Sequence, residues 1–189
     1  MSPTGSPTGS TFSLPGLSLV VGGARSGKSR VAEGLVSLSG RPRTYIATAQ
    51  AFDDEMVTRI SQHRTGRGTD WHTIEAPMHL APALAAVPAG GVVLLDCATL
   101  WLSNHLLAES DLVQETAALL AALAACPAPV VVVSNEVGAG IVPENRLARL
   151  FRDEQGRLNQ RLAAQAGLVL GVMAGLPFAL KGDLPQGLA

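Results

Sequence analysis

Residues 17 to 35 read LSLVVGGARSGKSRVAEGL, and this stretch decides how the rest of the chain is interpreted. Its first five residues are apolar and predict a short buried strand, while Val31, Leu35 and Leu38 recur at the spacing of a helix. Between them, GGARSGKS matches the phosphate-loop pattern G-x-x-x-x-G-K-[ST], in the strand–loop–helix context that this pattern requires. The stretch therefore predicts a loop that binds the phosphates of a nucleoside triphosphate.

The chemistry of such a loop follows from its glycines and from the helix behind it. Glycines let the backbone curl so that its N–H groups face a polyphosphate, and the helix adds the positive end of its dipole. We expect Lys28 to reach the β- and γ-phosphates and the Ser29 hydroxyl to bind Mg²⁺.

Composition limits the kinds of partner. The chain has 189 residues, of which 47% are hydrophobic, and this suits one α/β domain with a substantial core. A net charge of −1, from 14 basic and 15 acidic residues, gives no bulk field that would recruit nucleic acid or an anionic membrane. No apolar run approaches the roughly 20 residues of a membrane span. Cys97 and Cys126 lack metal-ligand spacing and a disulfide framework, which predicts a reducing, cytoplasmic location.

Strand and helix patterns alternate along the chain. We expect a disordered leader at residues 1–14, a single nucleotide-binding catalytic domain at 15–182 and a loose tail at 183–189. Further strands are predicted at 44–47, 71–75, 91–96, 130–133 and 168–173, the last being the final strand, with helices at 53–63, 77–87, 99–107, 111–125 and 144–166. This order predicts an α/β fold with a mostly parallel sheet, helices on both faces and right-handed crossovers, the phosphate-loop (RecA-like) nucleotide-binding fold.

Polar residues follow several of these strands, as at the carboxyl edge of a parallel sheet that faces a ligand. Thr48, Ala49 and Gln50 follow the second strand, and Asp96 ends a run of aliphatic residues. An acid in that position is typical of a group beside Mg²⁺ and the γ-phosphate, although many ordinary buried strands also end in Asp.

His63 is the most ambiguous candidate. With Met56 and Ile60 it lies on one face of the predicted helix, and spacing alone favours a partly buried structural histidine over a nucleophile. The segment Arg64 to Arg67 that follows suits phosphate contact and equally suits a solvated loop. The arginines of the helix at 144–166 exceed what solubility needs, although a solvated face is the default interpretation.

Five segments together resemble one family. GGARSGKS, YIATAQAFDDEM, RISQHRTGR, NEVGAGIVPENRLARLFRD and GRLNQRLA closely resemble the bifunctional adenosylcobinamide kinase and adenosylcobinamide-phosphate guanylyltransferase family of cobalamin biosynthesis. Generic phosphate-loop kinases share the first motif, but not DDEM with its following QH, nor NEVGxGIVPEN. These two segments make the resemblance specific, and it extends from about Leu17 to about Met173.

The resemblance implies two activities and a set of site residues. Family members phosphorylate adenosylcobinamide with ATP or GTP and then transfer GMP from GTP to adenosylcobinamide phosphate through a covalent guanylyl-histidine, which corresponds here to His63. Lys28 and Asp96 complete the implied catalytic set, with Ser29 as the Mg²⁺ ligand. The resemblance also implies a homotrimer. The implied nucleotide-binding residues are Gly22, Gly23, Ala24, Arg25, Ser26, Gly27, Lys28, Ser29, Ala47, Thr48, Ala49, Arg64, Thr65, Gly66, Arg67, Glu75 and Asp96.

Two alternatives stay open. The first is a phosphate-loop small-molecule kinase in which His63 is structural and no guanylyl transfer occurs. The second is a nucleotide-switched binding protein that hydrolyses GTP slowly; against it, the chain has no guanine-reading Asn-Lys-x-Asp segment.

Overall fold

The structure is a computed structural model that describes residues 12–50 and 70–188. It contains one seven-stranded sheet with the strand order β3-β2-β4-β5-β1-β6-β7. The strands are β1 (Leu17–Gly22), β2 (Arg43–Ala47), β3 (Trp71–Glu75), β4 (Val92–Asp96), β5 (Val130–Asn135), β6 (Leu168–Met173) and β7 (Leu176–Lys181). The helices are α1 (Lys28–Leu38), α3 (Leu80–Ala85), α4 (Ala98–Leu107), α5 (Leu112–Ala125) and α6 (Arg146–Gln165).

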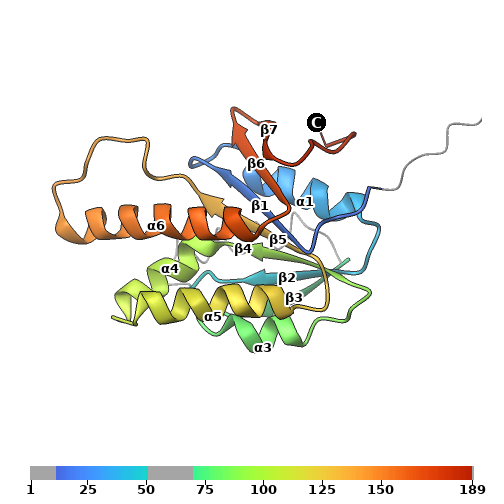
Figure 1. Cartoon of the computed structure of the whole chain (residues 1–189), viewed down its shortest axis with the longest axis horizontal. Coiled ribbons are helices and arrows are strands. Elements are labelled where there is room, and N and C mark those ends of the chain that lie inside the picture. The colour runs from blue at the N-terminus through green and yellow to red at the C-terminus, as the bar shows by residue number, and fades with distance from the viewer. Residues whose placement is uncertain (1–11, 51–69, 189) are drawn as a thin grey trace, which may run out of the picture.

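The sheet is parallel from β3 to β6. Strand β5, whose first four residues are all valine, pairs with β1 on one side and with β4 on the other. Because such a strand is buried on both faces, it carries apolar residues without alternation. Only β7, paired with β6, runs antiparallel within the described sheet. The expected mostly parallel sheet with helices on both faces is confirmed (Figure 1).

Alternate residues of the strands pack into two separate hydrophobic cores, one on each face of the sheet. Val20, Val131 and Leu170 pack with α1 on one face of the sheet. Leu19 and Val132 pack with α3, α4, α5 and α6 on the other face. In Figure 1, α1 accordingly lies across the sheet from α5 and α3. The period-two alternation of side chains along a strand produces this division.

Strand β7 corrects the sequence prediction, in which residues 168–173 formed the final strand. Residues Leu176–Lys181 continue the sheet through a two-residue turn, in which Ala174 has φ 52° and Gly175 has φ 82°. Such tight hairpin turns need positive φ at both positions, and their usual sequence signal is Asn-Gly or Asp-Gly. Ala-Gly is a weaker signal, so the hairpin was not predicted.

Two helices are shorter than expected. The helix predicted over 77–87 begins at Leu80 and ends at Ala85. The helix predicted over 144–166 begins at Arg146, because Asn145 is its N-cap and accepts hydrogen bonds from the N–H groups of Leu147 and Ala148. Asp111 is the N-cap of α5, and its side chain accepts hydrogen bonds from the N–H groups of Val113 and Gln114.

Both ends of the described chain pack onto the domain. Leu14, assigned by sequence to the leader, and Leu188, assigned to a loose tail, are each only 8% exposed and join the core under α1. The predicted boundaries at 14 and 182 thus leave out residues that contribute to this core. None of the described helices is long and apolar enough to span a membrane.

Candidate active site

The phosphate loop is a tight backbone turn between β1 and α1. Gly27, the residue before α1, has φ 93°, and Arg25 has φ 54°. The N-cap residue of α1 is a glycine, so it has no side chain that could occupy the first N–H groups of the helix. Lys28 Nζ donates to the carbonyl of Gly23 at 3.2 Å, which holds the ammonium against the loop. The backbone and this cation together form a site for anionic phosphate groups.

Gly22 and Ser26 face each other at the entrance of the loop. A Cβ atom on Gly22 would lie 2.5 Å from the carbonyl oxygen of Val172 and 2.6 Å from Ser26 Oγ, so only glycine fits. Ser26 Oγ is buried and has no hydrogen-bond partner among the described residues. A buried hydroxyl without a partner inside a phosphate loop fits a bound phosphate, which offers only acceptors.

The β6–β7 turn braces this loop from behind. The N–H of Gly175 donates to the carbonyl of Ser26 at 2.8 Å. Arg30, from the first turn of α1, donates to the carbonyl of Gly175 at 3.2 Å. A Cβ on Gly27 would approach the Cα of Gly175 to 3.1 Å, so the contact needs small residues on both sides. The hairpin that sequence reasoning missed is therefore a support of the nucleotide site.

The carboxyl ends of the strands bring the other predicted residues to the same edge. Ala47 pairs with Glu75 of β3 and with Asp96 of β4, so these three residues form one row across the sheet. On the other side of β5, Gly22 pairs with Asn135. The strand order therefore places the row with Asp96 and the phosphate loop on opposite sides of β5.

Thr48 joins this row to the turn after β4. Its Oγ1 accepts a hydrogen bond from the Cys97 N–H and donates to the Cys97 carbonyl, both at 2.8 Å. The Thr48 N–H donates to the carbonyl of Asp96 at 3.2 Å. Since Thr48 is completely buried, its hydroxyl positions the Asp96–Cys97 segment.

Helix α4 fixes the neighbouring segments through buried polar side chains. Asn104 Nδ2 donates to the carbonyls of Thr48 and Pro77, both at 2.9 Å. Trp101 Nε1 donates to the carbonyl of Met78 at 2.9 Å. These bonds tie residues 77 and 78, which precede α3, to α4.

The turn at Asp96 and Cys97 lies within electrostatic reach of the phosphate loop. Burial raises the pKa of the Cys97 thiol to about 12, the Asp96 carboxylate adds to this, and the Lys28 ammonium opposes it. The thiol therefore stays protonated near neutral pH and is not a nucleophile there.

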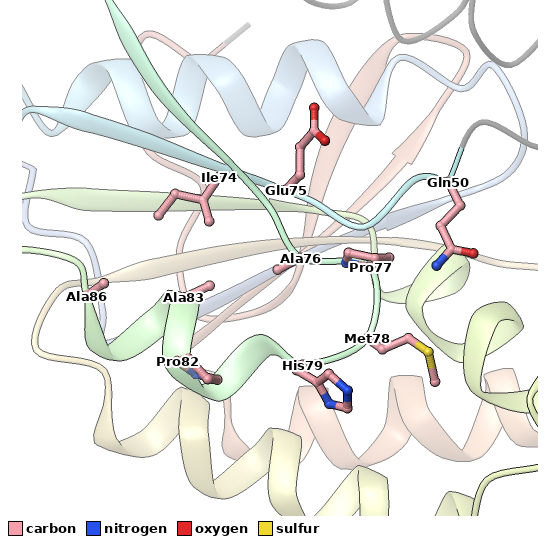
Figure 2. Close-up of a pocket in the computed structure, with 10 residues that line it drawn as sticks. All are labelled: Gln50, Ile74, Glu75, Ala76, Pro77, Met78, His79, Pro82, Ala83 and Ala86. Atoms are coloured by element: carbon pink, nitrogen blue, oxygen red, sulfur yellow. The ribbon is translucent and has the colours of Figure 1, made fainter.

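A hollow of about 520 Å³ lies beside Glu75, and sequence analysis did not predict it. Its walls come from β3 and α3, from the segment between them, and from residues just after β2 and α3: Gln50, Ile74, Glu75, Ala76, Pro77, Met78, His79, Pro82, Ala83 and Ala86. Figure 2 shows the Glu75 carboxylate pointing away from His79 and Met78. The nearby side chains are mainly apolar, so this hollow offers few groups for a charged ligand.

Several predicted site residues cannot be placed. His63, Arg64, Thr65, Gly66 and Arg67 lie outside the described residues, as does the helix expected at 53–63. Their assigned roles remain predictions. The described candidates all belong to the same edge of the sheet or to the loop and first turn of α1 that follow β1: Gly22 to Ser29, Ala47 to Ala49, Glu75 and Asp96.

The first strand of this mostly parallel sheet ends in a glycine-rich phosphate loop, and the Lys28 ammonium lies against that loop. These features define the class: this is a phosphate-loop nucleotide-binding α/β protein. A family model described as cobinamide kinase / cobinamide phosphate guanyltransferase matches residues 18–180. The chain belongs to this family, and the enzyme class inferred from the resemblance is confirmed.

Relatives support the same assignment. The bifunctional adenosylcobalamin biosynthesis protein CobP of Pseudomonas aeruginosa is 48% identical over 168 residues, which cover 87% of this chain and 97% of that protein. The proteins named CobU of Escherichia coli and Salmonella typhimurium are 46% and 47% identical, and each alignment covers 86% of this chain and 98% of the relative. Among solved structures, the RadB recombinase aligns with a TM-score of 0.44 and 19% identity over 84% of this chain and 74% of that one.

Proposed function

We propose that this chain carries out both family reactions on one sheet edge. It phosphorylates the free hydroxyl of adenosylcobinamide with ATP or GTP, and it then transfers GMP from GTP to adenosylcobinamide phosphate. The observation that carries the proposal is the phosphate loop, whose Gly22, Ser26 and Lys28 form a cradle suited to a triphosphate. That the phosphoryl group goes to adenosylcobinamide is inferred from family membership.

In the kinase reaction, the hydroxyl oxygen of adenosylcobinamide attacks the γ-phosphorus. A new P–O bond forms, the bond to the nucleoside diphosphate breaks, and the hydroxyl proton passes to solvent or to a base. The N–H groups of the loop and the Lys28 ammonium stabilise the charge that develops on the phosphoryl oxygens.

In the transfer reaction, we propose that His63 attacks the α-phosphorus of GTP. A P–N bond forms and pyrophosphate leaves. A phosphate oxygen of adenosylcobinamide phosphate then attacks the same phosphorus, so that a P–O bond forms, the P–N bond breaks and His63 is restored. Neutral imidazole is a capable nucleophile here because its reference pKa is about 6.5.

We include Mg²⁺ in the proposal. Ser29 and Asp96 offer the hard oxygen ligands that Mg²⁺ prefers, and Mg²⁺ in such sites takes one or two protein oxygens with the rest from phosphate and water. When bound, the ion would neutralise charge on the phosphates.

We also propose a homotrimer in the cytoplasm. Exposed apolar residues gather where α6 begins, at Ile141, Val142, Leu147 and Leu150, and they suit contact with another subunit. Both cysteines are free thiols, as expected in a reducing compartment. Sedimentation equilibrium at several protein concentrations tests the trimer, and a monomer at all concentrations would contradict it.

The function is tested with GTP labelled at the α-phosphate. The protein is incubated with this GTP and Mg²⁺, denatured, and assayed for bound label beside His63→Ala and a control, His72→Ala. His72 is a matched control because it lies exposed on β3. We expect acid-labile, alkali-stable label in wild type and in the His72 variant, and none in the His63 variant. Wild type that binds GTP but takes no label would remove the transferase reaction and leave a single-activity kinase.

A further inference from the structure

Asn135 ends the central strand at the point nearest the phosphate loop. It is the register partner of Gly22, and β5 lies between β1 and β4. Two residues earlier, Val133 belongs to the core under α1, whereas Ser134 faces α6 through a hydrogen bond to Asn159 at 2.6 Å. Because side chains alternate along a strand, Asn135 projects on the α1 face, the same face as Gly22.

Two helices hold the backbone of Asn135 in place. Its N–H donates to Thr99 Oγ1 of α4 at 2.8 Å. Its carbonyl accepts a bond from Asn159 Nδ2 of α6 at 3.0 Å. Gln155, completely buried, donates to both Ser134 Oγ and Asn159 Oδ1 and so fixes Asn159. The backbone N–H and carbonyl of Asn135 are thus both held, by α4 and α6, and these bonds do not use its carboxamide.

The carboxamide oxygen of Asn135 is a buried acceptor without a donor. Asn135 Oδ1 bonds to no atom of the described residues, and Ser26 Oγ, which would lie 2.6 Å from a Cβ on Gly22, is in the same state. Phosphate oxygens at neutral pH only accept hydrogen bonds, so a bound triphosphate satisfies Ser26 Oγ but cannot satisfy Asn135 Oδ1. A buried acceptor left unpaired is costly, which makes an incoming O–H or N–H donor favourable.

We propose that Asn135 binds adenosylcobinamide, the substrate that receives the phosphoryl group in the kinase reaction. Its Oδ1 accepts a hydrogen bond from the hydroxyl that attacks the γ-phosphorus. This inference rests on the proposed function. A neutral carboxamide cannot take the hydroxyl proton, which leaves to solvent or to another base as the P–O bond forms. Asn135 holds the hydroxyl oxygen in line with the γ-phosphorus, and orientation of this kind acts on the rate of the chemical step.

The two reactions of the enzyme allow a selective test. Adenosylcobinamide carries the free hydroxyl, whereas adenosylcobinamide phosphate no longer does. We therefore expect Asn135→Ala to lower kcat of the kinase reaction about 10- to 100-fold, an effect typical of one orienting contact. The KM for ATP and the rate of GMP transfer to separately prepared adenosylcobinamide phosphate should stay within about threefold of wild type. Asn135→Asp, which retains an acceptor oxygen of the same shape, should keep more kinase kcat than the alanine variant.

Other results would overturn the inference, each in a recognisable way. An equal loss of both reactions with a lower melting temperature would mean a structural role. A higher Mg²⁺ requirement with an equal loss of both reactions would mean that Oδ1 binds a metal-bound water. Unchanged kinase kcat in Asn135→Ala would mean that ordinary water satisfies the oxygen. Wild-type protein without either reaction would instead refute the proposed function, and the inference with it.

Discussion

Replacing Thr48 with valine removes one hydroxyl from a completely buried position without changing the shape of the side chain. In the wild type this hydroxyl serves both the N–H and the carbonyl of Cys97, each at 2.8 Å. Valine would leave these two backbone groups buried without that partner. The substitution therefore tests whether Thr48 is a structural tie between β2 and the turn after β4.

The expected magnitude follows from the number of groups affected. Each buried backbone group that loses its partner costs about 1–3 kcal/mol, and partial relaxation leaves a total of about 2–4 kcal/mol for the two. For a domain of this size, a loss of 1 kcal/mol lowers the melting temperature by about 2–4 °C. We therefore expect Thr48→Val to melt about 5–15 °C below wild type.

The assay is urea and thermal unfolding followed by circular dichroism, with Thr48→Ser as the matched control. Serine keeps the hydroxyl and loses one methyl group, so it should cost about 1 kcal/mol. A single net hydrogen bond contributes roughly 1 kcal/mol, so a valine variant whose free energy of unfolding lies within about 0.5 kcal/mol of wild type would refute the reasoning. So would a serine variant as unstable as the valine variant.

Two further predictions concern the phosphate loop and the turn beside it. Gly22→Ala should lower the free energy of unfolding by about 1–3 kcal/mol because its methyl group would meet the Val172 carbonyl at 2.5 Å, whereas Gly23→Ala, with nothing within 4 Å, should cost under 1 kcal/mol in the same urea titration. Equal losses in the two variants would argue against the steric cause. The pKa of the Cys97 thiol rises from its ordinary 9.0 to about 12 on folding, so the folded protein holds this proton more tightly than the unfolded chain does. The thiol proton therefore contributes its full share of stability below pH 9, and this share is lost as the pH rises toward 12. The stability of Cys97→Ala, measured by urea unfolding at pH 8 and pH 10.5, should fall less with pH than that of wild type, and identical slopes would contradict this.

Much of the fold could be predicted because its signals are local. The phosphate loop occupies consecutive residues, and the central strand at 130–133 is a plain run of valines. The errors arose where local signals were weak or were overridden. The hairpin to β7 uses Ala-Gly in place of a stronger turn pair, and residues 77 and 78, predicted as helix, are instead bonded through their carbonyls to side chains of α4.

The sequence by itself determined the phosphate loop, the mostly parallel sheet and the family, because each depends on residue types at fixed spacings along the chain. The tertiary structure decided which of the polar residues at the strand ends become neighbours. Strand order differs from chain order, so β5 enters between β1 and β4 and places Asn135 beside Gly22. For the same reason Thr48 meets Cys97, and Gly175 meets Ser26. Contacts between residues this far apart in the chain depend on the packing of the whole sheet, and no local pattern encodes them.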